Sequence, residues 1–326
     1  MRRGLKFIGW VVGVVAGVLI LLVAYFFWKY PDVDRPPVMK VEASPERLAR
    51  GKYLANHVTV CIDCHSERNW TLYSGPIIPG TEGKGGFRFG KEFGFPGSIY
   101  ARNITPSGIG SMTDGELFRA ITSGVRKNGQ AMFPIMPYPS FNKLSDEDLY
   151  SIIAYIRTLK PVESTIPETE LDFPVNFIVR TIPTRHSPVQ APDPSNLYEY
   201  GKYLVNAAAC SDCHSQQVKG EVVKGLEFAG GMEFPFPEGI VRSANITPDE
   251  DTGIGSWTLD NFVERFKHYA AADTATLEAE ASLHNSFMPW VMFSGMTDQD
   301  LTAIYKHLRT LPPVKNKVEK FTAKGE

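Results

Sequence analysis

One long apolar run opens the chain. From Phe7 to Trp28, the sequence FIGWVVGVVAGVLILLVAYFFW contains 22 residues and no charged side chain. As a helix of about 33 Å, it is long enough to cross a bilayer. A cleaved signal peptide would have a shorter apolar region followed by a small-residue cleavage site, so we expect residues 1–30 to be an uncleaved anchor. Because the basic residues Arg2, Arg3 and Lys6 precede the run, the positive-inside rule places residues 31–326 outside the cytoplasm.

Amphipathic patterns farther along the chain predict shorter helices. Apolar positions after Ser145 and after Thr297 recur at the spacing of one helix face, and both residues are favoured as helix N-caps. Prolines at 161 and 312 end these helices. Similar signals predict helices that begin at or just after Ser44, Thr113, Ser195 and Thr258. Strict alternation of apolar and polar residues is scarce, so we expect an all-α fold with little sheet.

The same sequence pattern occurs twice. RGKYLANHVTVCIDCHS, from Arg50, matches YGKYLVNAAACSDCHS, from Tyr200, and the segments that begin at Met136 and Met288 align without a gap. NITP also occurs in both copies and is followed each time by GIGS. We therefore divide the chain into an anchor (1–30), a linker (31–43), a first domain (44–162), a connector (163–194), a second domain (195–315) and a tail (316–326).

The connector between the copies is rich in proline, which favours an extended and fairly stiff segment. Its sequence LDFPVNFIVRTI is nevertheless too apolar for a free linker. We expect Phe173, Phe177 and Ile178 to pack across both domains and thereby to fix the distance between them.

Composition and charge exclude some functions. The hydrophobic fraction of 43% is ordinary for a globular protein, and 34 basic residues nearly balance 36 acidic ones. No basic stripe is present, so we do not expect a nucleic-acid partner.

The cysteines are more informative, because all four belong to two Cys-x-x-Cys-His motifs. These motifs are Cys61, Cys64 and His65 in the first copy and Cys210, Cys213 and His214 in the second. A zinc site usually needs two such pairs at short spacing, and neither motif has a second pair nearby. A disulfide or a thioredoxin-like redox pair does not require the histidine. Haem attachment does, because two thiols bond the vinyl groups and the histidine ligates iron. We expect two covalently bound haem c groups.

Each copy also offers a sixth iron ligand. Met136 and Met288 occupy the same position, just before the last helix of each copy, and a proline follows each. A thioether ligand raises the reduction potential and fills the position that a substrate would take. A place in the core is the alternative role for a methionine. Met132 and Met292 lack a counterpart at the repeat offset, so we expect neither to bind iron.

Residues of the repeated loops are further candidates. Short polar side chains that could donate to haem propionates are Asn103, Thr105, Asn245 and Thr247. The alternative is that they form an Asx-type turn before the proline of each loop. The side chains expected to wall the haems are Phe93, Phe95, Phe234 and Phe236.

The sequence resembles tandem class I cytochrome c domains. The features that carry this resemblance are the two Cys-x-x-Cys-His motifs, the methionine-proline pairs and the closing helices IRTLKPV and LRTLPPV. A narrower resemblance is to the cytochrome c subunits of bacterial membrane-bound alcohol, gluconate and aldehyde dehydrogenases. It is carried by the paired NITP and GIGS stretches and by the connector FPVNFIVR. Those subunits usually carry three haem domains. The resemblance implies two class I domains behind a transmembrane helix. It also implies that the first haem is ligated by His65 and Met136, and the second by His214 and Met288. Gly75 and Pro76 suit a carbonyl that orients His65, and the second copy lacks such a pair.

By this resemblance, the chain is an electron-transfer protein of the cytoplasmic membrane, with its haem domains on the periplasmic side and no substrate of its own. Its partners would be a dehydrogenase or quinol-oxidising complex and a terminal oxidase. The alternatives are a dihaem peroxidase with one open iron site and a structural subunit of a respiratory supercomplex. The second copy is longer around residues 270–287, and we expect this insertion to lie on the surface beside the second haem as a docking site.

Overall fold

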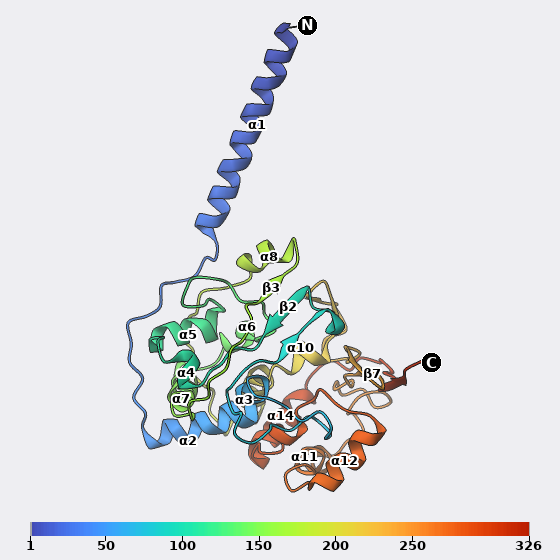
Figure 1. Cartoon of the computed structure of the whole chain (residues 1–326). Coiled ribbons are helices and arrows are strands. Elements are labelled where there is room, and N and C mark those ends of the chain that lie inside the picture. The colour runs from blue at the N-terminus through green and yellow to red at the C-terminus, as the bar shows by residue number, and fades with distance from the viewer. Residues whose placement is uncertain (1, 326) are drawn as a thin grey trace.

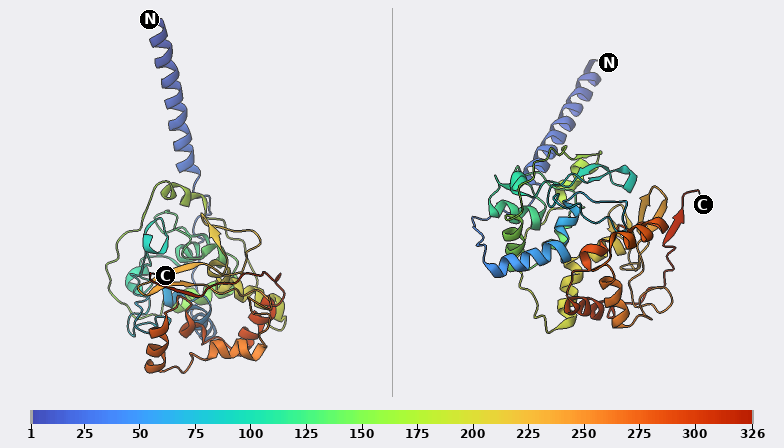
Figure 2. Two further views of the ribbon diagram at one scale, coloured as in Figure 1. Left: turned by 90° about the vertical axis from the view of Figure 1, so that its right-hand side faces the viewer. Right: turned by 60° about the horizontal axis from the view of Figure 1, so that its bottom comes forward.

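Helix α1 (Arg2–Lys29) projects from the rest of the molecule, as Figures 1 and 2 show. The structure is a computed structural model that describes residues 2–325. Within α1, the segment Lys6–Lys29 has a mean hydropathy of 2.8 and is not buried against the body. It is therefore long and apolar enough to cross a membrane, a property that an anchor shares with a signal sequence.

The body is mostly helical, and its helices form two similar sets. The first half contains α2 (Pro45–Tyr53), the π-helical turn η1 (Leu54–Val58), α3 (Cys61–Cys64), α4 (Pro106–Ile109), α5 (Asp114–Ser123), α6 (Tyr138–Phe141) and α7 (Asp146–Ile156). The second half contains α9 (Leu197–Ala207), α10 (Cys210–His214), α11 (Leu259–Lys267), α12 (Thr274–Leu283), α13 (Trp290–Phe293) and α14 (Asp298–Leu308). The N-caps predicted at Thr113, Ser145, Thr258 and Thr297 are confirmed, since each side chain accepts a hydrogen bond from a first-turn amide.

In each half, the first long helix crosses the last one at a glycine. Helix α2 packs on α7, and α9 packs on α14. A Cβ atom at Gly51 would lie 1.8 Å from the carbonyl oxygen of Ser151, and one at Gly201 would lie 1.9 Å from that of Ala303. Only a residue without a side chain permits this approach. The close crossing therefore explains the glycine of the repeated GKYL sequence.

The two halves share one hydrophobic core. Leu54 and Leu149 of the first half and Leu204 and Leu301 of the second are fully buried, and all four belong to the same cluster of packed side chains. The halves are therefore packed together as one body.

Short antiparallel strands accompany the helices, so the fold is mostly rather than entirely helical. The strands are β1 (Arg88–Phe89), β2 (Gly97–Tyr100), β3 (Glu170–Leu171), β4 (Gln217–Val218), β5 (Glu221–Val222), β6 (Glu233–Phe236), β7 (Gly239–Arg242) and β8 (Phe321–Ala323). They pair in the orders β1-β2-β3, β4-β5 and β6-β7-β8. Strand β3 lies in the predicted connector and β8 in the predicted tail, so both segments add a strand to the neighbouring half.

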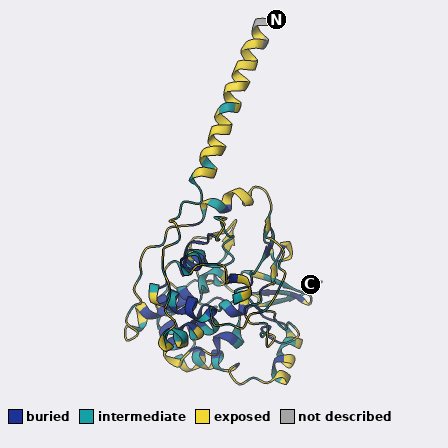
Figure 3. Ribbon diagram, turned by 60° about the vertical axis from the view of Figure 1, so that its left-hand side comes forward, coloured by how far each residue is buried: buried dark blue, intermediate teal, exposed yellow. Residues whose placement is uncertain are grey.

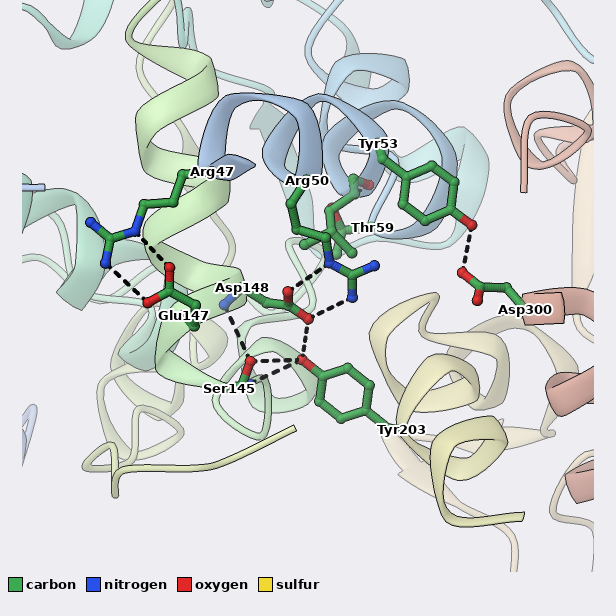
Figure 4. Close-up of polar contacts among 10 residues, drawn as sticks. Arg47, Arg50, Tyr53, Thr59, Ser145, Glu147, Asp148, Tyr203 and Asp300 are labelled. Atoms are coloured by element: carbon green, nitrogen blue, oxygen red, sulfur yellow. Dashed lines mark hydrogen bonds and ion pairs between the residues drawn. The ribbon is translucent and has the colours of Figure 1, made fainter. Parts of the chain in front are cut away.

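A polar network joins the halves (Figure 4). Tyr53 on α2 donates to Asp300 on α14 at 2.5 Å, and Tyr203 on α9 donates to Asp148 on α7 at 2.6 Å. The Tyr53 hydroxyl also accepts a hydrogen bond from the amide of Thr297, the N-cap of α14, at 3.1 Å. The Tyr203 hydroxyl accepts one from the amide of Ser145, the N-cap of α7, at 3.1 Å. Arg50 adds a bidentate ion pair to Asp148, at 2.8 and 2.9 Å. The network is nearly symmetric, because equivalent tyrosines reach equivalent aspartates.

The connector does not bridge the halves as predicted. Phe173, Phe177 and Ile178 are 79%, 39% and 51% exposed, which makes that expectation wrong. Two of these residues belong to α8 (Val175–Ile178), which lies near the foot of α1 in Figure 1. There the ring of Phe177 lies 5.9 Å from the ring of Phe27 on α1.

The insertion at 270–287 is only partly a surface feature. It forms α12, on which Leu283 is 73% exposed, whereas Leu277 is buried. The carbonyl oxygen of Leu277 accepts a hydrogen bond from the amide of Tyr73 at 3.0 Å. Asn285 accepts one from the amide of Ser74 at 2.9 Å. The insertion therefore binds the first half, which its prediction as a surface docking site did not anticipate.

Candidate haem sites

Both Cys-x-x-Cys-His motifs follow a residue in the left-handed backbone conformation. Val60 has φ +45° and Ala209 has φ +50°, values that residues with a Cβ adopt infrequently. The helical turns α3 and α10 begin at the next residue, Cys61 and Cys210 respectively. None of the four cysteines forms a disulfide with another described residue. The two motifs therefore have the same local geometry.

The two histidines are held in the same way. The Nδ1 atom of His65 lies 2.6 Å from the carbonyl oxygen of Arg102, and that of His214 lies 2.7 Å from the carbonyl oxygen of Ala244. Because a carbonyl only accepts, Nδ1 carries the proton and the lone pair of Nε2 is free to bind a metal. Burial lowers the pKa of both histidines, which favours the neutral form that ligates iron.

The carbonyl groups that orient the histidines are not those expected from sequence. The carbonyl of Gly75 accepts from Arg68, and that of Pro76 accepts from the amide of Asn69. The orienting carbonyls belong instead to the residue before each NITP loop, which is the same position in both copies. That repeated loop is the sequence signal that points to them. Both histidines therefore have equivalent carbonyl partners, although only the first copy contains the Gly75–Pro76 pair.

A cavity of about 330 Å³ lies beside the first motif. Cys61, Cys64, His65 and Met136 line it. Much of the remaining wall is apolar and includes Phe89, Ile99, Phe133 and Phe141. Two thiols, an imidazole and a thioether around an apolar cavity are the donor set that covalent haem c requires. Met132 lines the same cavity, and the repeat offset favours Met136 over it.

An arginine in the wall of this cavity has spare donor capacity. Arg180 lies on the 3₁₀ turn η3 (Val179–Thr181) and lines the cavity. Among the residues that the structure describes, nothing accepts a hydrogen bond from its buried Nε atom. A buried unpaired cationic donor is unfavourable unless an anionic group binds beside it. A haem propionate is such a group, so this residue fits a haem-binding cavity.

The loop that carries the second predicted methionine is held by the first half. The hydroxyl of Ser74 donates to the carbonyl of Met288 at 2.7 Å. Met292, the competing thioether, is buried in a cluster with Ala55 and Ile62 of the first half. Of the two methionines, the structure therefore commits Met292 to packing between the halves, which favours Met288 as the candidate ligand.

The polar residues of the NITP loops bind the protein itself. Asn103 accepts from the amide and the hydroxyl of Thr105, at 2.8 and 2.7 Å, and donates to the carbonyl of Val162 at 2.7 Å. Asn245 and Thr247 form the same contacts in the second half. The geometry therefore favours the Asx-turn alternative over a role as propionate donors, because these side chains fasten each loop to the segment after the last long helix.

Three of the phenylalanines expected to wall the haems surround Phe287. Ring centroids of Phe93, Phe234 and Phe236 lie 5.3, 5.1 and 5.4 Å from that of Phe287. Trp70 joins them at 5.0 Å. These residues form an aromatic cluster between the halves. Sequence reasoning missed Trp70 and Phe287, because neither recurs at an equivalent position in the other copy.

Comparison with known proteins assigns a family. Residues 198–312 match the sequence profile of the cytochrome c family. The chain is 29% identical over 296 residues to the cytochrome c subunit of the quinone-dependent alcohol dehydrogenase of Gluconobacter oxydans, an alignment that covers 84% of this chain and 56% of that subunit. It is 31% identical over 301 residues to the fructose dehydrogenase cytochrome subunit of Gluconobacter japonicus, with 86% and 56% coverage.

A shorter relative is a dihaem c-type cytochrome of Cereibacter sphaeroides, which is 24% identical over 266 residues, with 78% of this chain and 82% of that protein covered. The chain spans about half the length of the dehydrogenase subunits it matches. Residues 198–312 therefore belong to the cytochrome c family, and the chain is related to the cytochrome c subunits of alcohol and fructose dehydrogenases.

Proposed function

We propose that the chain is an electron-transfer subunit that holds two haem c groups covalently, one in each half. It passes electrons between a dehydrogenase or quinol-oxidising complex and a terminal acceptor. The observation that carries this proposal is the paired geometry of the motifs, in which each histidine directs Nδ1 to a backbone carbonyl and leaves Nε2 free. The relatedness to cytochrome subunits of alcohol and fructose dehydrogenases supports a dehydrogenase as the partner.

The chain's own residues have distinct tasks in this proposal. The thiols that would form thioether bonds belong to Cys61, Cys64, Cys210 and Cys213. The axial ligands would be His65 with Met136 and His214 with Met288. Bound haem supplies a one-electron iron couple. The carbonyls of Arg102 and Ala244 prevent rotation of the imidazoles and raise their basicity. Because protein side chains would then occupy both axial positions, the sites would suit a carrier better than a peroxidase.

The packing of the halves supports a fixed arrangement of the two sites. The shared core and the Tyr53–Asp300 and Tyr203–Asp148 hydrogen bonds leave the halves little freedom to move independently. In this proposal, the halves are tandem class I cytochrome c domains at 44–162 and 195–315. Their fixed separation would keep electron transfer between the two sites independent of domain motion.

The proposal also includes membrane anchoring by α1. The helix remains uncleaved, crosses the cytoplasmic membrane once and leaves residues 31–325 on the periplasmic side. Its exposed apolar surface and length support this placement, and so do the basic residues that precede the span.

The test uses the full chain expressed together with haem maturation factors. The intact mass counts the attached haems and shows whether the first 30 residues remain. A spectroscopic redox titration, repeated with peroxide, then separates a carrier from an enzyme. Two low-spin haems with methionine-to-iron charge-transfer absorbance and no reaction with peroxide support the proposal. A single attached haem, or a high-spin haem that consumes peroxide, overturns it.

A further inference from the structure

Three exposed apolar side chains lie at the foot of α1. Phe173, Phe177 and Ile178 are 79%, 39% and 51% exposed, and they follow one another closely along the connector around α8. Figure 1 shows α8 near the foot of α1, and the ribbon of α1 in Figure 3 is coloured almost entirely as exposed. Large apolar side chains that remain exposed next to one another indicate an interaction surface. We refer to these three residues as the apolar foot.

Contacts connect the apolar foot to the candidate span. The ring of Phe177 lies 5.9 Å from that of Phe27. The guanidinium of Arg180 lies 4.9 Å from the centre of the Phe27 ring, and its Nη2 atom donates to the carbonyl of Tyr30 at 2.5 Å. Because Phe27 is within the span Lys6–Lys29, the apolar foot lies at the depth where the span leaves the membrane.

The residues around Phe27 identify this depth independently. Tyr25 and Trp28 are exposed on α1, and Tyr30 follows directly after the helix. Tyrosine and tryptophan are enriched where transmembrane helices meet the headgroup region. Phenylalanine and isoleucine exposed at that level contact acyl chains and headgroups rather than bulk water.

We propose that the apolar foot is a second membrane contact, which inserts into the interface of the lipid bilayer beside α1. This inference rests on the proposed anchoring by α1. Lipid is the occupant because these side chains lie beside a helix whose apolar span is not buried by the described protein, so the bilayer that surrounds α1 also reaches α8.

A second contact orients the haem-binding body. Asn176, Val179 and Arg180 come from the same short segment and line the first cavity. The apolar foot therefore holds the first site toward the membrane, while α11 and α12 of the second half lie on the far side of the body from α1 (Figure 1). If the body were attached to the membrane only through α1 and the flexible segment after it, the body could rotate relative to the membrane.

Photocrosslinking in lipid tests the proposal. The full chain is placed in nanodiscs of phosphatidylcholine and phosphatidylglycerol, and a photoreactive p-benzoylphenylalanine replaces one residue at a time. The test positions are Phe173→p-benzoylphenylalanine and Phe177→p-benzoylphenylalanine. The matched control is Leu283, which is 73% exposed on α12, and the control for the anchor is Ile20. An unchanged haem spectrum shows that each variant is folded.

We expect lipid adducts at positions 20, 173 and 177 and none at 283. Adducts at 20 but not at 173 or 177 overturn this inference and leave the anchoring intact. An absence of adducts at 20 overturns the anchoring itself. Protein adducts at 173 in native membranes, without lipid adducts in nanodiscs, overturn the inference in favour of a protein partner.

Hydroxyl-radical footprinting of the unmodified chain provides a second measurement without substitution. Oxidation is compared after division by the intrinsic reactivity of each side chain, because hydroxyl radical attacks an aromatic ring faster than an aliphatic chain. Phe173 and Leu283 have similar exposure, 79% and 73%, so their normalised oxidation should be similar if water surrounds both. In nanodiscs, we expect at least a five-fold lower oxidation of Phe173 than of Leu283, with Trp28 protected as well. Equal oxidation of Phe173 and Leu283 contradicts the lipid contact.

Discussion

Tyr53 and Asp300, 247 residues apart in the chain, form a hydrogen bond of 2.5 Å across the boundary between the two halves. Burial and the nearby Asp300 raise the pKa of Tyr53, so its hydroxyl stays protonated and donates. The equivalent Tyr203–Asp148 bond on the other side of the boundary measures 2.6 Å. A duplicated sequence therefore produces a reciprocal interface, in which each copy uses a tyrosine to bind the last long helix of the other.

The two tyrosines should nevertheless differ in importance. Tyr53→Phe removes the hydroxyl that Asp300 accepts from and leaves a buried carboxylate with less compensation, which costs about 1–3 kcal/mol of unfolding free energy. Tyr203→Phe should cost about 1 kcal/mol or less, because Arg50 still forms its bidentate pair with Asp148. Denaturant unfolding of the two haem-loaded variants measures both values. An equal or larger loss for Tyr203→Phe would contradict this reading of the network.

The candidate ligand of the first site can be separated from its neighbour. Met136→Ala should remove about half of the methionine-to-iron charge-transfer absorbance and lower one of the two reduction potentials, because a thioether ligand raises the potential. Met132→Ala is the control, since that residue lines the same cavity and is not expected to bind iron. If Met132→Ala shows the spectral loss and Met136→Ala does not, the assignment is reversed.

A similar pair of methionine variants tests the second site, but here the control variant should lose stability. Met288→Ala should change the spectrum of the second haem. Met292→Ala should leave both spectra unchanged and reduce the unfolding free energy by about 2–5 kcal/mol, because Met292 is buried between the halves. Absorbance and denaturant titrations on the same samples measure the two effects. A spectral change in Met292→Ala with a normal Met288→Ala would refute the predicted ligand.

The helix crossings should not tolerate a single added methyl group. Gly51→Ala or Gly201→Ala places a carbon within 2 Å of a carbonyl oxygen and should cost about 3 kcal/mol or more, because the backbones must separate. Gly13→Ala in α1 is the matched helical control, since nothing lies within 4 Å of the added carbon. Thermal unfolding of the three variants checks the contrast. Comparable stability of Gly51→Ala and Gly13→Ala would show that the crossing relaxes easily.

The insertion should influence the second site through Asn285. This side chain accepts from the amide of Ser74 and donates to the carbonyl oxygens of Trp70 and Leu72, while Ser74 holds the loop that carries Met288. Asn285→Ala should cost about 2–3 kcal/mol through these lost partners and alter the spectrum of the second haem. Ser282→Ala, at an exposed position on α12, should do neither. An unchanged spectrum in Asn285→Ala would contradict the predicted influence of the insertion on the second site.

Features that depend on nearby residues were predictable from sequence. The Cys-x-x-Cys-His motifs, the caps at Thr113 and Ser145 and the apolar run of α1 each lie within a short stretch of chain. Side-chain chemistry and helical periodicity specify such features directly. The duplication was also visible, because the residues that build each half had to be kept in both copies.

Other features depend on backbone groups or on segments far apart, and only the tertiary structure decided them. The carbonyls of Arg102 and Ala244 orient the histidines without any side-chain signal, since every residue has a carbonyl. The apolar residues of the connector could have covered either half, and the position of α1 leaves Phe173 exposed beside it. The interface between the halves could not be predicted from sequence either, because the sequence does not show which helix Tyr53 and Tyr203 contact. The sequence therefore determined the candidate donor atoms and the repeated helices, and the packing of the chain determined how the two histidines are oriented and which surfaces remain uncovered.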